Sequence, residues 1–426
     1  MISLYRFLTT IFYPLFIIFI YFRKILKKED SVRYKEKFLS SHFRSIRNKN
    51  KKLIWFHAAS IGELKSILPI INKLNDQNEN FEFLITTITL SSSNLAKEEL
   101  KLVKNSYHRF LPIDVNFLIK KFFKVWSPDI IFLVDSEIWP NLILNSQQLK
   151  IPIGLINARL TSNSLKKWMM FPKIAKRIFK VFDLFICSDS KTKNFLEKLN
   201  LKNVYFKGNI KLFGQVDAKK IKDINENYLI EKKFWFAAST HKDEDIFCIN
   251  THLKLKKKFP NISTIIAPRH VERSQKIKSL CEKFNLNAQV LNKNEVILNN
   301  KEIIIVNYFG FLHNYFKYSK SVFIGKSMVE KLKNEGGQNP IEAAKLSCKI
   351  YHGPYVSNFE EIYKILEESN ISKKIYSFDE LSSNLAIDLE NSQKKSSEIS
   401  NTISGLGEKT LNDTMQLINN FLDDVN

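Results

Sequence analysis

Short apolar runs alternate with longer amphipathic, lysine-rich stretches along most of the chain. The runs are rich in Ile, Val and Phe, and the stretches between them repeat their apolar positions at helical spacing. This alternation is typical of βαβ units, in which helices cover both faces of a parallel sheet. We therefore predict an α/β protein. The predicted strands are residues 53–59, 83–89, 130–135, 153–157, 184–188, 234–238, 264–267, 303–306 and 322–324, and the predicted helices include 63–74, 94–103, 115–125 and 190–199.

A polar stretch interrupts the alternation near the middle of the chain, at residues 214–228. A length of 426 residues also favours two domains rather than one. We predict doubly wound domains at residues 25–214 and 229–426, joined by a linker at 215–228 and with a cleft between them. The last helices are expected to break at Gly405-Leu406-Gly407. Ligands of such sheets bind beyond the carboxyl ends of the strands.

The N-terminus carries an uncharged apolar run from Phe7 to Phe22, preceded by Arg6 and followed by several basic residues. The run is slightly shorter than the ~20 residues that span a bilayer, and no small-residue cleavage site follows it. We predict a membrane anchor at residues 1–24 that either spans the bilayer or lies in its surface, with a buried core helix as the alternative. The positive flank after the run favours a cytoplasmic main body.

The chain is strongly basic, with a net charge of +23 from 66 basic and 43 acidic residues. The lysines are spread along the chain, without zinc-finger spacing or an Arg-rich tract, so we predict no nucleic-acid partner. An anionic membrane surface is the favoured partner, although background composition explains the excess equally well. The four cysteines are far apart, which indicates neither a disulfide framework nor a metal site.

A glycine-rich loop stands out at residues 336–344, which read GGQNPIEAA. Two glycines free the backbone, and Pro340 suits the first position of a helix because it has no N–H to satisfy. Glu342 would then lie in the first turn, where free N–H groups can bind an anion or a ribose. An ordinary loop before a helix is the alternative.

Glu63 lies at a predicted helix start, in the sequence HAASIGE from His57. Its spacing from Ser60 matches a capping box, in which Glu63 only reaches back to the Ser60 N–H. The functional alternative is a general base, which needs a carboxylate within hydrogen-bonding reach of an acceptor hydroxyl.

Two acids, Asp135 and Glu137, follow another predicted strand. They can bind a cation, cap the next helix or orient a lysine. Arg159 and Lys211 also follow predicted strands, and two cations beside an acid pair indicate an anionic ligand.

In the second half, Thr240-x-x-Asp243 predicts a helix start, and the acids that follow are expected to complement the helix dipole. Arg269 comes directly after a strand and can clamp a phosphate.

Together these segments resemble the 3-deoxy-D-manno-octulosonic acid (Kdo) transferases of lipopolysaccharide synthesis, which have the GT-B fold. The resemblance runs from the anchor to about residue 366. The segments that carry it are KED-x-x-R from Lys28, HAASIGE, DSEIWPN, NARLTSNS, GNIK, ASTHKDE, PRHVER and GGQNPIEAA.

The resemblance implies an inverting, metal-independent transfer of Kdo from CMP-Kdo to a lipid A precursor, without a cofactor, at the cytoplasmic face of the inner membrane. Glu63 matches the proton acceptor of the family. Glu137 and Lys211 match positions that stabilise the transition state, and we expect Glu137 to fix the lysine. The nucleotide contacts that match are Pro268, Arg269, Asn339, Pro340, Ile341 and Glu342.

One departure from the family lies at residues 307–312, which read NYFGFL where the family usually has an Asp-Thr-Met-Gly-Glu-Leu run. Both acids are absent, so Phe309, Gly310 and Phe311 are expected to contact CMP through their backbone. The missing acids keep open the alternative of a membrane-tethered binding protein with impaired catalysis. A second alternative is another GT-B enzyme, such as a different lipid-linked glycosyltransferase or a sugar-nucleotide epimerase, because the fold alone does not separate these activities.

Overall fold

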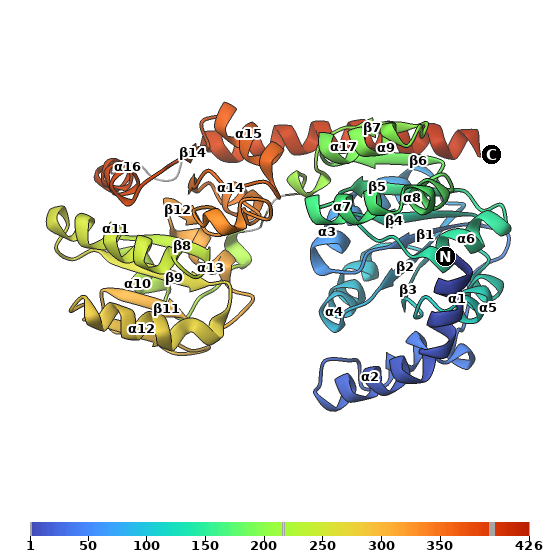
Figure 1. The fold of residues 1–426 in the computed structure, drawn as a ribbon, viewed down its shortest axis with the longest axis horizontal. Coiled ribbons are helices and arrows are strands. Elements are labelled where there is room, and N and C mark those ends of the chain that lie inside the picture. The colour runs from blue at the N-terminus through green and yellow to red at the C-terminus, as the bar shows by residue number, and fades with distance from the viewer. Residues whose placement is uncertain (1, 215, 217, 392–396, 426) are drawn as a thin grey trace. The chain divides into compact units, whose positions relative to one another are not determined.

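The computed structural model describes residues 2–214, 216, 218–391 and 397–425, and it forms two compact units (Figure 1). The first unit comprises Met1–Gly214 and Gly407–Asn426, and the second comprises Gln215–Leu406. Positions 215 and 217 of the expected linker lie outside the described residues. The rest of that stretch contains a short 3-10 helix, Ala218–Lys220, and the start of α10 (Glu226–Glu231).

The first unit is built on a seven-stranded parallel sheet with the strand order β3-β2-β1-β4-β5-β6-β7. Its strands are β1 (Lys52–His57), β2 (Phe81–Thr87), β3 (Ser106–Phe110), β4 (Ile130–Val134), β5 (Ile153–Ala158), β6 (Leu184–Cys187) and β7 (Val204–Phe206). The helices are α3 (Ile61–Gln77), α4 (Leu90–Glu99), α5 (Asn116–Trp126), α6 (Pro140–Gln148), α7 (Ser162–Met170), α8 (Pro172–Phe179) and α9 (Ser190–Lys198).

Both faces of this sheet are buried, because side chains alternate between them along each strand. Trp55 and Ile131 belong to the core on one face, which α5, α6 and α8 complete. Their neighbours Phe56 and Phe132 belong to the core on the other face, with α3. Continuous apolar strands of this kind are what a parallel sheet covered on both sides requires.

The second unit has the same design, with the strand order β10-β11-β9-β8-β12-β13-β14. Its strands are β8 (Phe234–Thr240), β9 (Ser263–Pro268), β10 (Ala288–Leu291), β11 (Ile303–Val306), β12 (Ser321–Ile324), β13 (Lys349–His352) and β14 (Ser372–Lys374). The helices are α10, α11 (Glu244–Lys258), α12 (Ser274–Lys283), α13 (Leu312–Tyr318), α14 (Ile341–Lys345), α15 (Glu360–Glu368) and α16 (Phe378–Glu390).

Every predicted strand is present, and the strands that the sequence pattern missed lie at or next to the sheet edges: β3, β7, β10, β13 and β14. Edge strands are short and only partly covered, so they lack the continuous apolar run that identified the central ones. Helix α4 starts at Leu90 instead of the predicted residue 94, because Thr89 caps it by accepting a hydrogen bond from the Ser92 N–H.

The C-terminal helix α17 (Ser397–Asp424) contradicts the predicted break at Gly405-Leu406-Gly407, because it is continuous through both glycines. A Cβ at Gly407 would lie 2.7 Å from the Leu212 carbonyl oxygen, so this glycine permits close backbone packing instead of ending the helix. Beyond it, Ile418 and Phe421 join the core under α3, and the Phe421 ring meets Phe132 at 5.9 Å. We had expected these last residues in the second domain, whereas they group with the first unit.

The N-terminal apolar run forms two helices, α1 (Ile2–Ile11) and α2 (Tyr13–Ile25), rather than one. Pro14 lacks the N–H that would continue the helical hydrogen bonds of α1, and the two helix axes differ by 54°. Within the part of the chain that the structure describes, no single helix is long and apolar enough to span a membrane. The bent pair meets that criterion by length and composition only.

The two helices have one attached face and one exposed apolar face. The Tyr5 hydroxyl donates to Asp114 at 2.8 Å and the Tyr13 hydroxyl to the Phe38 carbonyl at 2.6 Å, both in the first unit. Phe7, Ile18 and other large apolar side chains of the pair are more than half exposed.

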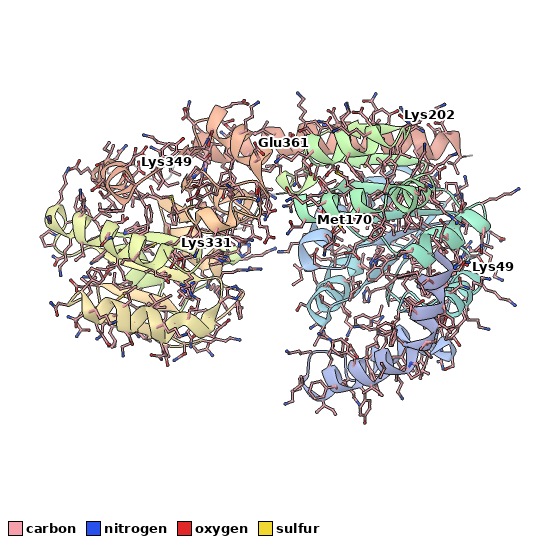
Figure 2. All side chains as sticks on the ribbon, viewed as in Figure 1. Lys49, Met170, Lys202, Lys331, Lys349 and Glu361 are labelled. Carbon is pink, nitrogen blue, oxygen red and sulfur yellow. The ribbon has the colours of Figure 1, made fainter. Side chains whose placement is uncertain are left out.

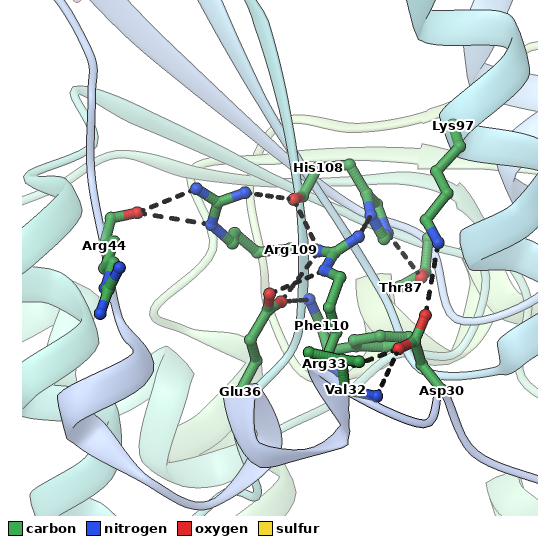
Figure 3. A network of polar contacts seen from close by, with 10 residues as sticks. All are labelled: Asp30, Val32, Arg33, Glu36, Arg44, Thr87, Lys97, His108, Arg109 and Phe110. Carbon is green, nitrogen blue, oxygen red and sulfur yellow. Dashed lines mark hydrogen bonds and ion pairs between the residues drawn. The ribbon is translucent and has the colours of Figure 1, made fainter.

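A network of hydrogen bonds and ion pairs connects the segment after α2, from Asp30 to Glu36, to the edge strand β3 (Figure 3). Arg33 forms a bidentate pair with Glu36 and donates to the His108 carbonyl at 2.9 Å and to its Nδ1 at 3.1 Å. Burial and the nearby Arg33 charge lower the pKa of His108 to about 3, so the neutral ring can accept from Arg33. Asp30 accepts from the Arg33 N–H and pairs with Lys97. The KED-x-x-R segment therefore anchors the N-terminal helices to β3.

The basic charge is distributed over the surfaces of both units, as exposed Lys49, Lys202 and Lys331 illustrate (Figure 2).

Candidate active site

Glu63 lies in the first turn of α3, just beyond the carboxyl end of β1. The Ser60 side chain caps the helix by accepting from the Glu63 N–H at 3.3 Å, so this half of the predicted capping box is confirmed. The expected return bond to the Ser60 N–H is replaced by one to the Ala59 N–H. The Glu63 carboxylate accepts from the Ala59 N–H at 2.8 Å and from the Ser60 hydroxyl at 2.7 Å. These two bonds fix the orientation of the carboxylate.

The same carboxylate is electrostatically unusual. Burial raises the pKa of Glu63, and the nearby charges of Asp135 and Glu137 raise it further, against the hydrogen bonds from Ser60 and Ala59. A raised pKa makes a carboxylate a stronger base, which suits general-base catalysis. Capping and catalysis are therefore compatible in this residue.

Lys211 pairs with Asp135, not with Glu137, so the expectation that Glu137 fixes the lysine is wrong. Asp135 follows β4 in a left-handed backbone conformation, with a φ of 55°, and its other oxygen accepts from Asn157. Asn157 in turn accepts from the Ile210 N–H at 3.1 Å, beside the lysine. Asp135 therefore orients Lys211, which is one of the three roles that the sequence left open for the acid pair.

Glu137 has a different set of partners. Its carboxylate accepts from the Trp139 indole N–H at 2.8 Å and lies 3.2 Å from Nε2 of His57. His57 is fully buried at the end of β1, and its Nδ1 lies 2.9 Å from the Thr86 hydroxyl. His57 holds Glu137 near Glu63, a role that the sequence analysis missed although the residue opens the HAASIGE segment.

Arg159 lies at the same edge of the sheet, beyond β5. Burial lowers its pKa, while Asp135 and Asp189 oppose that shift. The first unit therefore brings together Glu63, Asp135, Glu137, Arg159 and Lys211, all from segments that follow parallel strands.

The second unit contains a pocket of about 170 Å³ beyond β8, β9 and β11. The apolar residues Ala267, Pro268 and Val306 line it together with Arg269. The remaining lining residues are Ser239, Tyr308, Phe309, Gly310, Phe311, Leu312, His313 and Glu342. Six predicted nucleotide contacts thus line one pocket: Pro268, Arg269, Phe309, Gly310, Phe311 and Glu342.

The other three predicted contacts, Asn339, Pro340 and Ile341, are not among the lining residues. Helix α14 begins at Ile341, one residue later than predicted, with Pro340 as its N-cap. The exposed Asn339 side chain accepts from the Ile341 N–H at 3.1 Å.

The glycines before α14 are explained by packing within the chain. A Cβ at Gly336 would lie 2.2 Å from the Tyr355 carbonyl oxygen, and Gly337 has a φ of 85°.

Several cations surround His241 beside this pocket. Burial lowers the pKa of His241 to about 4, and the charges of Lys326, His270, Arg273 and Arg269 contribute to the shift. His241 is therefore neutral at pH 7 within a positive environment, which favours an anionic ligand.

Glu244 connects the loops after β8 and β12, two adjacent strands at the centre of the sheet. Its buried carboxylate accepts from the backbone N–H groups of His241, Lys326, Ser327 and Met328 at 2.7–3.0 Å. The predicted helix start at Thr240 is wrong, because α11 begins at Glu244 after Asp243. The first-turn acids were predicted, but this connection was not.

Comparison with known proteins identifies the family. A family profile described as "3-Deoxy-D-manno-octulosonic-acid transferase (kdotransferase)" matches residues 32–213. A 3-deoxy-D-manno-octulosonic acid transferase from Rickettsia bellii is 30% identical over 429 residues, covering 99% of this chain and 100% of the relative. The chain belongs to the 3-deoxy-D-manno-octulosonic acid transferase family.

As a member of the Kdo transferase family, the chain is a glycosyltransferase. A relative named as a mitochondrial 3-deoxy-D-manno-octulosonic acid transferase from Arabidopsis thaliana is 29% identical over 382 residues, covering 86% of this chain and 83% of the relative.

The fold agrees with this assignment. A glycosyltransferase from Rickettsia africae superposes with a TM-score of 0.55 at 11% identity, covering 88% of this chain and 98% of that structure. The Kdo transferase fold here is thus of the expected GT-B class, with two Rossmann-like domains.

No set of three His, Cys, Asp or Glu side chains among the described residues of this Kdo transferase is arranged to hold a metal ion.

Proposed function

We propose that this Kdo transferase moves Kdo from CMP-Kdo to a lipid A precursor, with inversion at the anomeric carbon and without a metal ion or other cofactor. Glu63 is the general base. The observation that carries the proposal is the raised pKa of an oriented Glu63 carboxylate beside Asp135 and Glu137.

The proposed step begins at a sugar hydroxyl of the acceptor. Glu63 takes the hydroxyl proton as the oxygen forms a bond to the anomeric carbon of Kdo, and the bond from that carbon to the CMP phosphate oxygen breaks. The bonding electron pair leaves with CMP. Attack from the face opposite the leaving group inverts the carbon.

The charges of the first unit support this chemistry. Lys211, oriented by Asp135, supplies a positive charge for a carboxylate or phosphate of a substrate. The pKa of Glu63 is raised mainly by burial and by Asp135, and the charge of Glu137, which is held by His57 and Trp139, raises it further.

The pocket of the second unit is the proposed site for the CMP part of the donor. Arg269, which lines it within the cationic surroundings of His241, suits the phosphate. We expect Glu342, whose carboxylate lies 3.3 Å from Nε2 of His313, to accept hydrogen bonds from the ribose hydroxyls.

The N-terminal helices are the proposed contact with the cytoplasmic face of the inner membrane. Their exposed Phe7, Ile18, Phe19 and Phe22 side chains suit the acyl boundary, while the other side of the pair is attached to the first unit. This arrangement favours a helix pair lying in the membrane surface rather than across it.

Transfer of radiolabelled Kdo from CMP-Kdo to a lipid A precursor, in the presence and absence of excess EDTA, tests the proposal. We expect the same rate in both conditions. A preference for UDP-sugar donors would favour another GT-B glycosyltransferase, and CMP-Kdo binding without transfer would favour the impaired binding protein. A strict requirement for a divalent metal would overturn metal independence.

A further inference from the structure

The loop after β11 gives the donor pocket an aromatic wall. Tyr308, Phe309 and Phe311 all line the pocket, within a stretch of four residues. Gly310 separates the two phenylalanines with a φ of 93°, a conformation that glycine adopts without strain. This turn allows residues on both sides of Gly310 to border the same space.

Two of these rings are held in place by contacts within the chain. The Tyr308 and Phe311 rings meet edge to face at 5.0 Å, and the Tyr308 and Tyr315 hydroxyls lie 2.6 Å apart. Tyr315 is fully buried, so its hydrogen bond links Tyr308 to the core of the second unit. The rings on either side of Phe309 are therefore held in place by contacts within the unit.

Phe309 differs from its neighbours because 65% of its surface is exposed to solvent. An exposed phenylalanine contributes little to folding, since its apolar surface remains in water. Its position at a pocket with Arg269 and Glu342 indicates that a flat ligand covers the ring.

A nucleobase suits such a surface. Stacking of a base on an aromatic side chain contributes about 1–3 kcal/mol and does not depend on the identity of the base. We propose that Phe309 holds the base of the donor nucleotide by stacking, with Tyr308 and Phe311 supporting the loop, so that this side chain and not only its backbone contributes to donor affinity. This inference rests on the proposed function, because it takes the pocket to be the site of the donor nucleotide.

The test is calorimetric titration of the full-length protein in detergent with CMP, and competition of bound CMP by ribose 5-phosphate, which has no base. We expect Phe309→Ala to weaken CMP binding about tenfold, or 1.4 kcal/mol, and to leave the affinity for ribose 5-phosphate unchanged. Phe309→Trp should bind CMP at least as tightly as the unaltered protein.

Tyr376→Ala is the matched control, because Tyr376 is an aromatic residue of the same unit with a similar exposure of 67%. If Phe309→Ala binds CMP as tightly as the unaltered protein, stacking is wrong while the proposed function stands. An equal loss for CMP and ribose 5-phosphate would also overturn stacking, because it would indicate damage to the loop. If the unaltered protein does not bind CMP, both the proposed function and this inference fail.

Discussion

The two units present their functional residues in contrasting ways, although both are doubly wound parallel sheets. The first unit gathers charged groups that are held by other side chains, as Asp135 holds Lys211 and His57 holds Glu137. The second presents a largely apolar and aromatic pocket that Arg269 and Glu342 also line. Under the proposed function, a proton is transferred at the first unit and the donor nucleotide is bound at the second. Substitutions should therefore affect turnover in the first unit and donor affinity in the second.

The largest expected effect is at Glu63. Glu63→Gln keeps the size of the side chain and an acceptor for the Ala59 N–H, but it removes the base, so transfer should fall by about 10³-fold. CMP affinity should not change. Single-turnover transfer and calorimetry measure the two quantities, with Glu79→Gln as an exposed control. Near-normal turnover would remove Glu63 from its proposed role.

A smaller loss of turnover is expected at Asp135. Asp135→Asn removes the charge that orients Lys211, and we expect roughly a 10²-fold fall in kcat, in the range of a lost electrostatic contact in an active site. Steady-state kinetics with both substrates measure this fall, and the exposed Asp76→Asn is the control. A change confined to the donor KM would contradict the division of roles between the units.

Substitution of Arg269 should change the KM for the donor more than kcat. Arg269→Ala removes a charged partner for the donor phosphate, so the KM for CMP-Kdo should rise about tenfold while kcat changes less. Donor titrations of the initial rate measure both constants, with Lys257→Ala in α11 as an exposed control. An unchanged donor KM would place the phosphate elsewhere.

The smallest effect concerns pH. Burial and the charges of Asp135 and Glu137 raise the pKa of Glu63, and a base must be deprotonated to act. Activity should therefore fall with decreasing pH at an apparent pKa above 4.5, the ordinary value for glutamate. In Asp135→Asn this apparent pKa should move down, because one neighbouring negative charge is lost. Profiles of kcat/KM against pH measure this shift, and a higher apparent pKa in Asp135→Asn would contradict the prediction.

The sequence predicted the central strands and the segments that carry the site, because buried parallel strands and their polar ends leave a clear pattern. It did not predict the edge strand β3, because a partly exposed strand lacks a continuous apolar run. It did not predict the continuous α17 either, because Gly407 serves close packing inside a helix that a glycine would usually end. Nor did it predict which acid holds Lys211. That choice depends on the backbone turn at Asp135, with its φ of 55°, which no spacing of residues reveals.

Glu244 has a consequence for where the donor can bind. At the first helix after the first strand, many α/β sheets recruit an anion from solution through free amide hydrogens. Here the Glu244 side chain, at the start of α11, accepts from the His241 N–H before this helix and from three N–H groups of the loop after β12. Under the proposed function, the donor phosphate is therefore bound by side chains such as Arg269, in the pocket at the ends of β9 and β11, and not by these four N–H groups.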